Sequence, residues 1–149
     1  MSDNSENKIL FYEKEFYMFS NFSSFIVEYD GYIWPTSEYA YQASKFTDES
    51  VINQIKNAKS SHEAFNISRN NEDKVKPNWS DIRVSVMEDI VRAKLDQHEY
   101  IKEKLLDTGS REIVENSPTD DFWGWGLNKD GQNQLGKIWM KLRDEIMKS

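Results

Sequence analysis

The chain has 149 residues, no cysteine, two histidines and a formal net charge of −7. This length suits one domain with a sizeable core, and the lack of cysteine excludes disulfides, thiolate zinc sites and a cysteine nucleophile. His62 and His98 lie far apart in polar segments, so we expect them at the surface and expect neither a metal centre nor a cofactor. The acidic charge disfavours a protein that holds long nucleic acids by their phosphates, but it permits a local basic pocket for a small anion.

The N-terminal residues are polar and show no apolar signal-peptide core, and no run approaches membrane-spanning length. We therefore predict a disordered tail over residues 1–7 and a domain over residues 8–149. We also expect a cytoplasmic location and no membrane partner.

The first predicted elements are strands separated by an aromatic loop. Residues 8–13 are typical of a strand, and residues 16–22 form a loop rich in aromatic side chains. Two further strands, 25–29 and 32–34, flank Asp30-Gly31, a dipeptide typical of a β-hairpin turn. This pattern predicts a small antiparallel sheet near the N-terminus.

Helices dominate the rest of the chain. Pro35 ends the hairpin, and Thr36 or Ser37 can cap the helix that follows. Two short helices are predicted over 48–58 and 61–69, the second with Ser60 and Glu63 as a capping box. A longer helix from about Ser80 is expected to turn Ile82, Val86, Ile90 and Ala93 inward. The chain then continues with a helix over 98–108 that ends at Gly109, a strand over 112–115, a loop over 116–132 and a final helix from Asn133. The predicted fold class is α+β, a mostly helical single domain.

The helix after the hairpin carries a candidate site. Glu38 and Lys45 lie seven residues apart, about two helical turns, so both project from one face. Tyr41 and Gln42 follow Glu38 by three and four residues and share that face. A carboxylate, an amine, a phenol and an amide on one short helix indicate a site.

A second segment, residues 115–136, is rich in glycine, which tolerates positive φ and lets a ligand approach the backbone. Asn133 is expected to cap a helix whose first amides can hold a phosphate. The segment is not a phosphate-binding P-loop, because the Gly-Lys-Ser/Thr ending is absent. Its glycines alone are a weak signal.

Together, the two segments resemble the NADAR family, the YbiA-like N-glycosidases, over nearly the whole chain from Phe11 to Arg143. The matching residues are Phe19-Ser20-Asn21-Phe22, Trp34-Pro35-Thr36-Ser37-Glu38, Gln42-Ala43, Lys45-Phe46, Trp79, Arg83, Met87, Lys94, Gln97, Val114-Glu115, Asp120, Trp123-Gly124, Gly126, Asn133, Leu135-Gly136, Met140 and Arg143. The chain departs from the family at Leu95, where phenylalanine is usual, and at Ser68, where glycine is common. Neither position touches the implied chemistry.

The resemblance implies a YbiA-like fold and a hydrolase that cleaves the bond between ribose C1 and an exocyclic amine of a base. The implied substrates are phosphorylated ribosylamino-pyrimidine intermediates of riboflavin biosynthesis, or ADP-ribosylated guanine in a nucleotide or in modified DNA or RNA. The implied catalytic residues are Glu38, Lys45 and Asp120, and the implied substrate-binding residues are Asn21, Trp34, Tyr41, Gln42, Arg69, Trp79, Arg83, Trp123, Gly124 and Asn133. Oligomeric state and partner proteins stay open.

Two mechanisms are open for these residues. In one, Glu38 supports an oxocarbenium-like transition state and activates water. In the other, which we favour, the sugar ring opens to an imine and Lys45 displaces the base through a Schiff base, with Glu38 moving protons. The second route needs a lowered pKa for Lys45. Burial among Trp34, Tyr41 and Phe46 would lower this pKa, whereas the nearby carboxylate would raise it.

Each candidate also has a purely structural interpretation. Glu38 can complement a helix dipole, and Lys45 can be a solvated charge at a helix end. Arg83 can pair with an acid on its own helix instead of clamping a phosphate. Asp120 suits a turn as well as a contact to ribose hydroxyls or water, and tryptophans are more often core residues than stacking surfaces. The alternative function is a non-catalytic module that binds ADP-ribose or NAD, but the presence of both Glu38 and Lys45 favours the enzyme.

Overall fold

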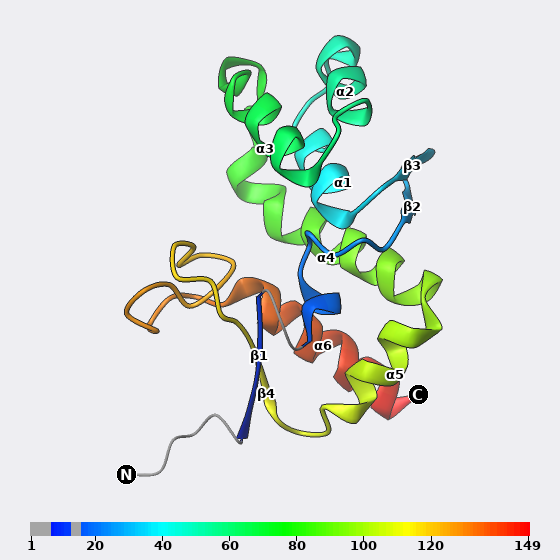
Figure 1. Cartoon of the computed structure of the whole chain (residues 1–149), viewed down its shortest axis with the longest axis vertical. Coiled ribbons are helices and arrows are strands. Elements are labelled where there is room, and N and C mark those ends of the chain that lie inside the picture. Colours follow the sequence, from blue (N-terminus) through cyan, green and yellow to red (C-terminus); the bar gives the residue numbers. More distant parts are fainter. Residues whose placement is uncertain (1–6, 13–15) are drawn as a thin grey trace. The chain divides into compact units, whose positions relative to one another are not determined.

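The structure, a computed structural model, describes residues 7–12 and 16–149. Their contacts divide the chain into two compact units, one formed by Asn21–Gln97 and the other by Met1–Ser20 with His98–Ser149. The first unit is a continuous stretch of chain, whereas the second is assembled from both ends (Figure 1). Residues 1–6 of the predicted tail, and the end of the strand predicted over 8–13, lie outside the described residues.

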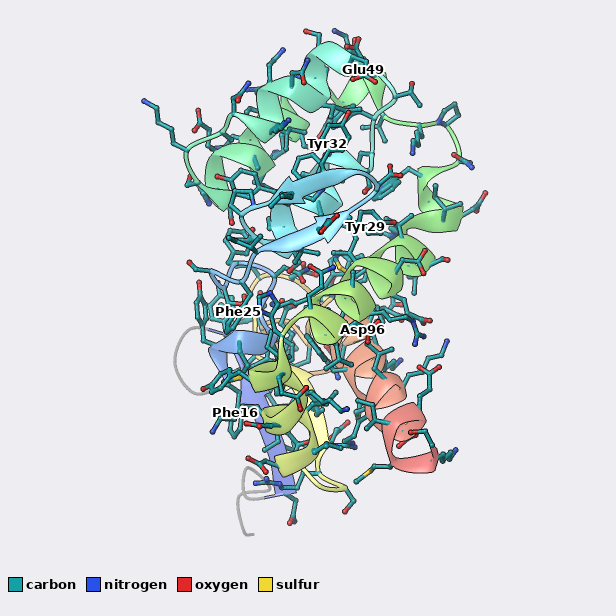
Figure 2. The ribbon with its side chains drawn as sticks, turned by 90° about the vertical axis from the view of Figure 1, so that its right-hand side faces the viewer. Phe16, Phe25, Tyr29, Tyr32, Glu49 and Asp96 are labelled. Atoms are coloured by element: carbon teal, nitrogen blue, oxygen red, sulfur yellow. The ribbon has the colours of Figure 1, made fainter. Side chains whose placement is uncertain are left out.

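The continuous unit begins with the predicted hairpin. Strands β2 (Val27–Tyr29) and β3 (Tyr32–Trp34) are antiparallel, with Tyr29 opposite Tyr32 next to the turn (Figure 2). Both turn residues have positive φ, 53° at Asp30 and 84° at Gly31, as expected for the tight hairpin turn that this dipeptide favours. The small antiparallel sheet near the N-terminus is therefore confirmed, although β2 begins two residues later than predicted.

Four α-helices complete this unit: α1 (Ser37–Ala43), α2 (Glu49–Lys56), α3 (Ser61–Arg69) and α4 (Trp79–Gln97), with a short 3₁₀ turn at Glu72–Lys74. Side-chain caps define the starts of α1 and α3, because Thr36 accepts a hydrogen bond from the Tyr39 amide at 3.5 Å and Ser60 accepts one from the Glu63 amide at 3.0 Å. The Glu63 carboxylate accepts a hydrogen bond from the Lys59 amide. A capping box would instead use the amide of the next residue, Ser60.

Helix α1 lies at the centre of this unit. It contacts α2, α3, α4 and both strands of the hairpin (Figure 1), and all seven of its residues are buried. A helix that is buried all round is usually apolar, yet α1 carries Ser37, Glu38 and Gln42. These polar side chains need partners inside the protein.

The buried face of α4 differs from the predicted one. Of the four residues expected to face inward, Ile90 is fully buried, whereas Ile82, Val86 and Ala93 are half-buried. The buried residues of α4 are Trp79, Met87, Ile90, Val91, Lys94 and Leu95. The buried stripe thus contains a lysine, a residue that sequence patterns assign to the solvent side.

The second unit joins the two ends of the chain. Strand β1 (Lys8–Phe11) pairs in parallel with β4 (Glu112–Glu115), and Ile9 and Phe11 of this pair are buried. Helices α5 (Glu99–Asp107) and α6 (Gln134–Lys148) contact each other, and α6 packs on β4. The strand at 112–115 is as predicted, but its parallel pairing was not expected.

The core of the second unit is aromatic. The ring of Trp139, on α6, lies 4.9 Å from the ring of Phe19 in the 3₁₀ turn Tyr17–Phe19, and its indole N–H donates to the Phe19 carbonyl at 3.0 Å. Among the described residues, no helix has the length and apolar content needed to cross a membrane.

Candidate functional site

The aromatic loop before the hairpin positions the first turn of α1. The backbone carbonyl of Asn21 accepts a hydrogen bond from the Glu38 amide at 3.0 Å, and its side-chain oxygen accepts one from the Ser37 hydroxyl at 3.1 Å. Its amide nitrogen lies 3.3 Å from the Met87 sulfur on α4. Asn21, predicted to bind substrate, therefore holds the helix that carries Glu38.

Glu38 and Gln42 form a buried pair on α1. Their exposed fractions are 6% and 2%, and the Gln42 Nε2 donates to Glu38 Oε2 at 2.7 Å. A hollow of about 730 Å³ in the same unit is lined by Tyr39 but not by this pair. The pair thus lies outside this hollow and is nearly shielded from solvent.

Lys45 follows the end of α1 and extends the same face. Its ammonium lies 5.4 Å from the centre of the Tyr41 ring, and its backbone carbonyl accepts a hydrogen bond from the Lys76 amide at 2.8 Å. Burial lowers the pKa of Lys45, and the charges of Glu38 and Glu72 raise it by a smaller amount. The pKa of Lys45 therefore lies below its ordinary value. The amine is therefore easier to deprotonate than that of a solvated lysine.

The start of α4 brings two more predicted residues to this face. Trp79 is buried, and its ring lies 5.3 Å from the ring of Tyr41. Arg83, one turn further along α4, is close enough for its charge to lower the pKa of Lys45. The structure thus gathers a carboxylate, an amide, an amine, two rings and a guanidinium in one unit.

Two predicted residues of this unit have other local contacts. Trp34 is buried in the hairpin, where its indole N–H donates to the Tyr29 carbonyl at 3.2 Å. Arg69 is exposed in the last turn of α3, with its guanidinium 5.7 Å from the centre of the Phe65 ring. These contacts are structural, and the binding roles of Trp34 and Arg69 stay predictions.

Lys94 is a buried ionisable residue to which the sequence reasoning gave no role. It has no exposed surface, and its Nζ lies 2.9 Å from the Ser23 hydroxyl and 5.6 Å from the centre of the Phe25 ring. Burial lowers the pKa of Lys94 to about 7. Lys94 follows Met87 by seven residues, Ile90 by four and Val91 by three. This helical spacing is a signal that could have placed Lys94 on the buried face of α4.

The remaining candidates lie in the second unit, in the loop between β4 and α6. Asp120 Oδ1 accepts hydrogen bonds from the amides of Phe122 and Trp123 at 3.0 and 2.8 Å, as in an Asx turn. The half-buried Trp123 packs edge-on against Phe122. At Gly124, a Cβ would lie 2.7 Å from the Glu115 carbonyl oxygen, so this glycine is required for close packing of the loop.

Asn133 precedes α6 as predicted, but its side chain does not cap the helix. It adopts a left-handed conformation with φ of 50°, donates to the Ile113 carbonyl and accepts from the Glu115 amide, both at 2.9 Å. The first two amides of α6, at Gln134 and Leu135, donate to loop carbonyls at 3.0 Å. These two amides are therefore occupied within the protein, and the phosphate contact predicted at this helix start stays a prediction.

Within residues 7–12 and 16–149, no three histidine, aspartate or glutamate side chains gather in a way that could hold an ion. The chemistry of the α1 face is that of a carboxylate, an amide and an amine.

Comparison with known proteins gives consistent matches over most of the chain. The family model described as "NADAR domain" matches residues 10–147. The N-glycosidase YbiA of Shigella boydii is 38% identical over 128 residues, which is 86% of this chain and 80% of that protein. A riboflavin biosynthesis protein of Vibrio vulnificus is 38% identical over 143 residues, which is 95% of this chain but 39% of that protein. The NMR structure of Escherichia coli YbiA superposes with a TM-score of 0.86 at 34% identity, covering 94% of this chain and 84% of that one.

Proposed function

The chain belongs to the NADAR family, and from this premise we propose that it is an N-glycosidase that hydrolyses the bond between ribose C1 and an exocyclic amine of a base. The name of the Shigella relative, an N-glycosidase, supports the reaction class. The observation that carries the proposal in this chain is the buried face of α1. There, Glu38 is hydrogen-bonded to Gln42, and Lys45 has a pKa lowered by burial.

The lysine route uses both ionisable groups. The glycosylamine ring opens, which makes C1 an imine carbon, and the neutral Lys45 Nζ adds to it. The C1–N bond to the base then breaks, the leaving amine takes up a proton, and a lysine–sugar Schiff base remains for water to hydrolyse. Glu38 moves the protons, and the lowered pKa of Lys45 increases the fraction of neutral amine at neutral pH.

In the direct-water route, the same carboxylate acts differently. Glu38 would stabilise the positive charge that develops at C1 and would accept a proton from the attacking water. Lys45 would then act only as a positive charge near the substrate phosphate or the leaving group. The two routes differ in one observable, a covalent bond between Lys45 and the sugar.

Two substrate classes fit the exocyclic-amine requirement. The name of the Vibrio relative supports phosphorylated ribosylamino-pyrimidine intermediates of riboflavin biosynthesis. ADP-ribosylated guanine, in a nucleotide or in modified DNA or RNA, presents the same kind of C1–N bond. Arg83 and Arg69 are the proposed contacts to phosphate or pyrophosphate, and Trp79 is the proposed contact to the base. The binding role of Trp123, in the other unit, stays a prediction.

The test is a hydrolysis assay read by mass spectrometry, on a ribosylamino-pyrimidine 5′-phosphate and on ADP-ribosylated guanosine. Wild type, Glu38→Gln and Lys45→Ala are compared with Lys56→Ala, which removes an exposed lysine that also lies over a tyrosine ring. We expect release of the free base from one substrate or both, lost in the first two variants only. ADP-ribose binding without turnover of either substrate would instead identify a non-catalytic ADP-ribose or NAD-binding module.

A further inference from the structure

The Gln42 side-chain amide has an oxygen that is not used within the protein. Gln42 is 2% exposed, and its Nε2 is bonded to Glu38. The Oε1 atom is buried and has no hydrogen-bond partner among the residues that the structure describes. Buried polar side-chain atoms nearly always have a partner, because leaving one unpaired is unfavourable.

Rotation of the amide cannot satisfy this oxygen. An ionised carboxylate only accepts hydrogen bonds, so the amide must present its N–H₂ group to Glu38. The opposite orientation would place two acceptors against each other. The hydrogen bond to Glu38 therefore keeps Oε1 directed away from the carboxylate, as an acceptor that awaits a donor.

Gln42 lies between the two proposed catalytic residues. It follows Glu38 by one helical turn, and Lys45 lies three residues later, just past the end of α1, where its amide donates to the Gln42 carbonyl at 3.3 Å. The charge of Glu38 is near enough to Lys45 to act on its pKa. A sugar carbon held between the carboxylate and the amine would face Gln42. The donors nearest to ribose C1 are the N–H of the leaving amine and the 2′-hydroxyl on the adjacent carbon.

The chemistry of the reaction separates these two donors. The amine proton is the one that Glu38 is proposed to move, and the amine departs with the base. The 2′-hydroxyl stays on the sugar through ring opening, Schiff-base formation and hydrolysis. Hydrogen bonds to the 2-hydroxyl also strengthen in glycosidase transition states.

We infer that Gln42 Oε1 accepts a hydrogen bond from the ribose 2′-hydroxyl and makes this site selective for ribosyl over 2′-deoxyribosyl substrates. The inference deepens the proposed function and rests on it for the identity of the sugar. The 2′-hydroxyl satisfies the buried acceptor, whereas a 2′-deoxy sugar leaves it unpaired. Such a site rejects an analogue that lacks its donor far more strongly than an apolar pocket does.

The test compares ribose with 2-deoxyribose in two ways. Calorimetry measures the dissociation constants of ribose 5-phosphate and 2-deoxyribose 5-phosphate, and the mass-spectrometric assay compares a ribosylamino-pyrimidine 5′-phosphate with its 2′-deoxy counterpart. For wild type we expect a preference for ribose of at least about tenfold in both. Gln42→Met, which is similar in size but has no comparable acceptor, should reduce the ratio to nearly one.

Ser44→Ala is the matched control. Ser44 lies at the end of the same helix, and its hydroxyl donates to the Ala40 carbonyl at 2.7 Å, so its loss should leave the ribose preference intact. Equal binding of the two sugar phosphates by wild type, or binding of neither, overturns the inference without any variant. A preference that survives in a folded Gln42→Met protein, checked by thermal melting, also overturns it.

The two proposals fail separately. Hydrolysis of ribosyl and deoxyribosyl substrates at equal rates would leave the N-glycosidase standing and remove the role of Gln42. A Gln42-dependent preference for ribose 5-phosphate, without turnover of any glycosylamine, would support the role of Gln42 and remove the N-glycosidase.

Discussion

Helix α1 and the loop between β4 and α6 both carry candidate residues, but they use their polar groups differently. In the loop, Asp120 and Asn133 bond to nearby backbone amides and carbonyls. In α1, Glu38 and Gln42 bond to each other, and the Gln42 oxygen stays without a partner among the described residues. The loop residues thus make contacts that stabilise the fold, whereas α1 holds a buried acceptor that no contact among the described residues satisfies.

The strongest test of this difference is Lys45→Ala. If Lys45 is the nucleophile, kcat should fall by about 10³-fold or more, because its covalent step is lost, while thermal stability changes little. Lys56→Ala should leave kcat unchanged. Borohydride should trap a lysine–sugar adduct in wild type, and mass spectrometry should locate it on Lys45. Full activity of Lys45→Ala, without any adduct, would leave only the direct-water route.

The pH dependence of the same reaction has a predictable sign. The neutral amine is the reactive form, and its fraction rises with pH up to the pKa of Lys45. Because burial lowers that pKa below the ordinary 10.5, the rising limb of kcat should have its midpoint below 10.5. A single-turnover pH profile checks this, and a limb centred at 10.5 or above contradicts it.

In the second unit, Gly136→Ala should have a large effect on stability. An added Cβ would overlap the Ile113 carbonyl oxygen and the Asn133 side chain, so α6 would have to move away from β4. We expect a loss of about 3 kcal/mol in the free energy of unfolding, measured by urea denaturation. The exposed neighbour Lys137→Ala should change it little. An unchanged stability of Gly136→Ala would show that α6 does not need this close approach.

Lys94 allows a similar test inside the unit that contains α1. Its pKa is about 7 in the folded protein but near 10.5 in the unfolded chain, so unfolding takes up a proton between these pH values. Stability should therefore rise with pH above 7, with a slope that approaches about 1.4 kcal/mol per unit, or about 2.3 kcal/mol in all between pH 7 and 9. Lys94→Met should lack this part of the pH dependence, as urea denaturation at several pH values would show. Parallel profiles for both proteins would contradict the assignment.

Asn133→Gly should give the smallest of these effects. Glycine accepts the left-handed backbone at this position, but the bonds to Ile113 and Glu115 are lost. We expect about 2 kcal/mol of destabilisation with kcat per folded molecule unchanged. Asn133→Asp, which keeps an acceptor for the Glu115 amide, should lose less. A large fall in kcat at full stability would instead assign Asn133 to substrate binding.

Local signals in the sequence predicted most of the elements. Asp30-Gly31 predicted the hairpin, and Ser60 predicted the start of α3, because both act on adjacent residues. The parallel pair of β1 and β4 was missed, since strands about a hundred residues apart share no turn that could indicate their register. The buried face of α4 was also assigned wrongly, because Lys94 has the composition of a surface residue.

The candidate site was predictable only in part. The shared face of Glu38, Gln42 and Lys45 follows from helical spacing alone. A turn role for Asp120 was among the structural interpretations, because its partners are the amides of Phe122 and Trp123 nearby in sequence. The contacts of Asn133 could not be derived, because Ile113 and Glu115 are distant in sequence. The direction of the shift in the Lys45 pKa likewise could not be predicted, because burial and the neighbouring carboxylates act in opposite directions and their balance depends on the folded structure.

The parallel pairing of β1 with β4 also has a consequence for biosynthesis. Residues 21–97 contain all the sequence of their own unit, so its helices can pack while later residues are still being added by the ribosome. Lys8–Phe11, in contrast, are made first but have to wait for Glu112–Glu115 before they can pair. Until then, Lys8–Phe11 have no strand to pair with, whereas the unit that holds Glu38 and Lys45 can fold without waiting for them.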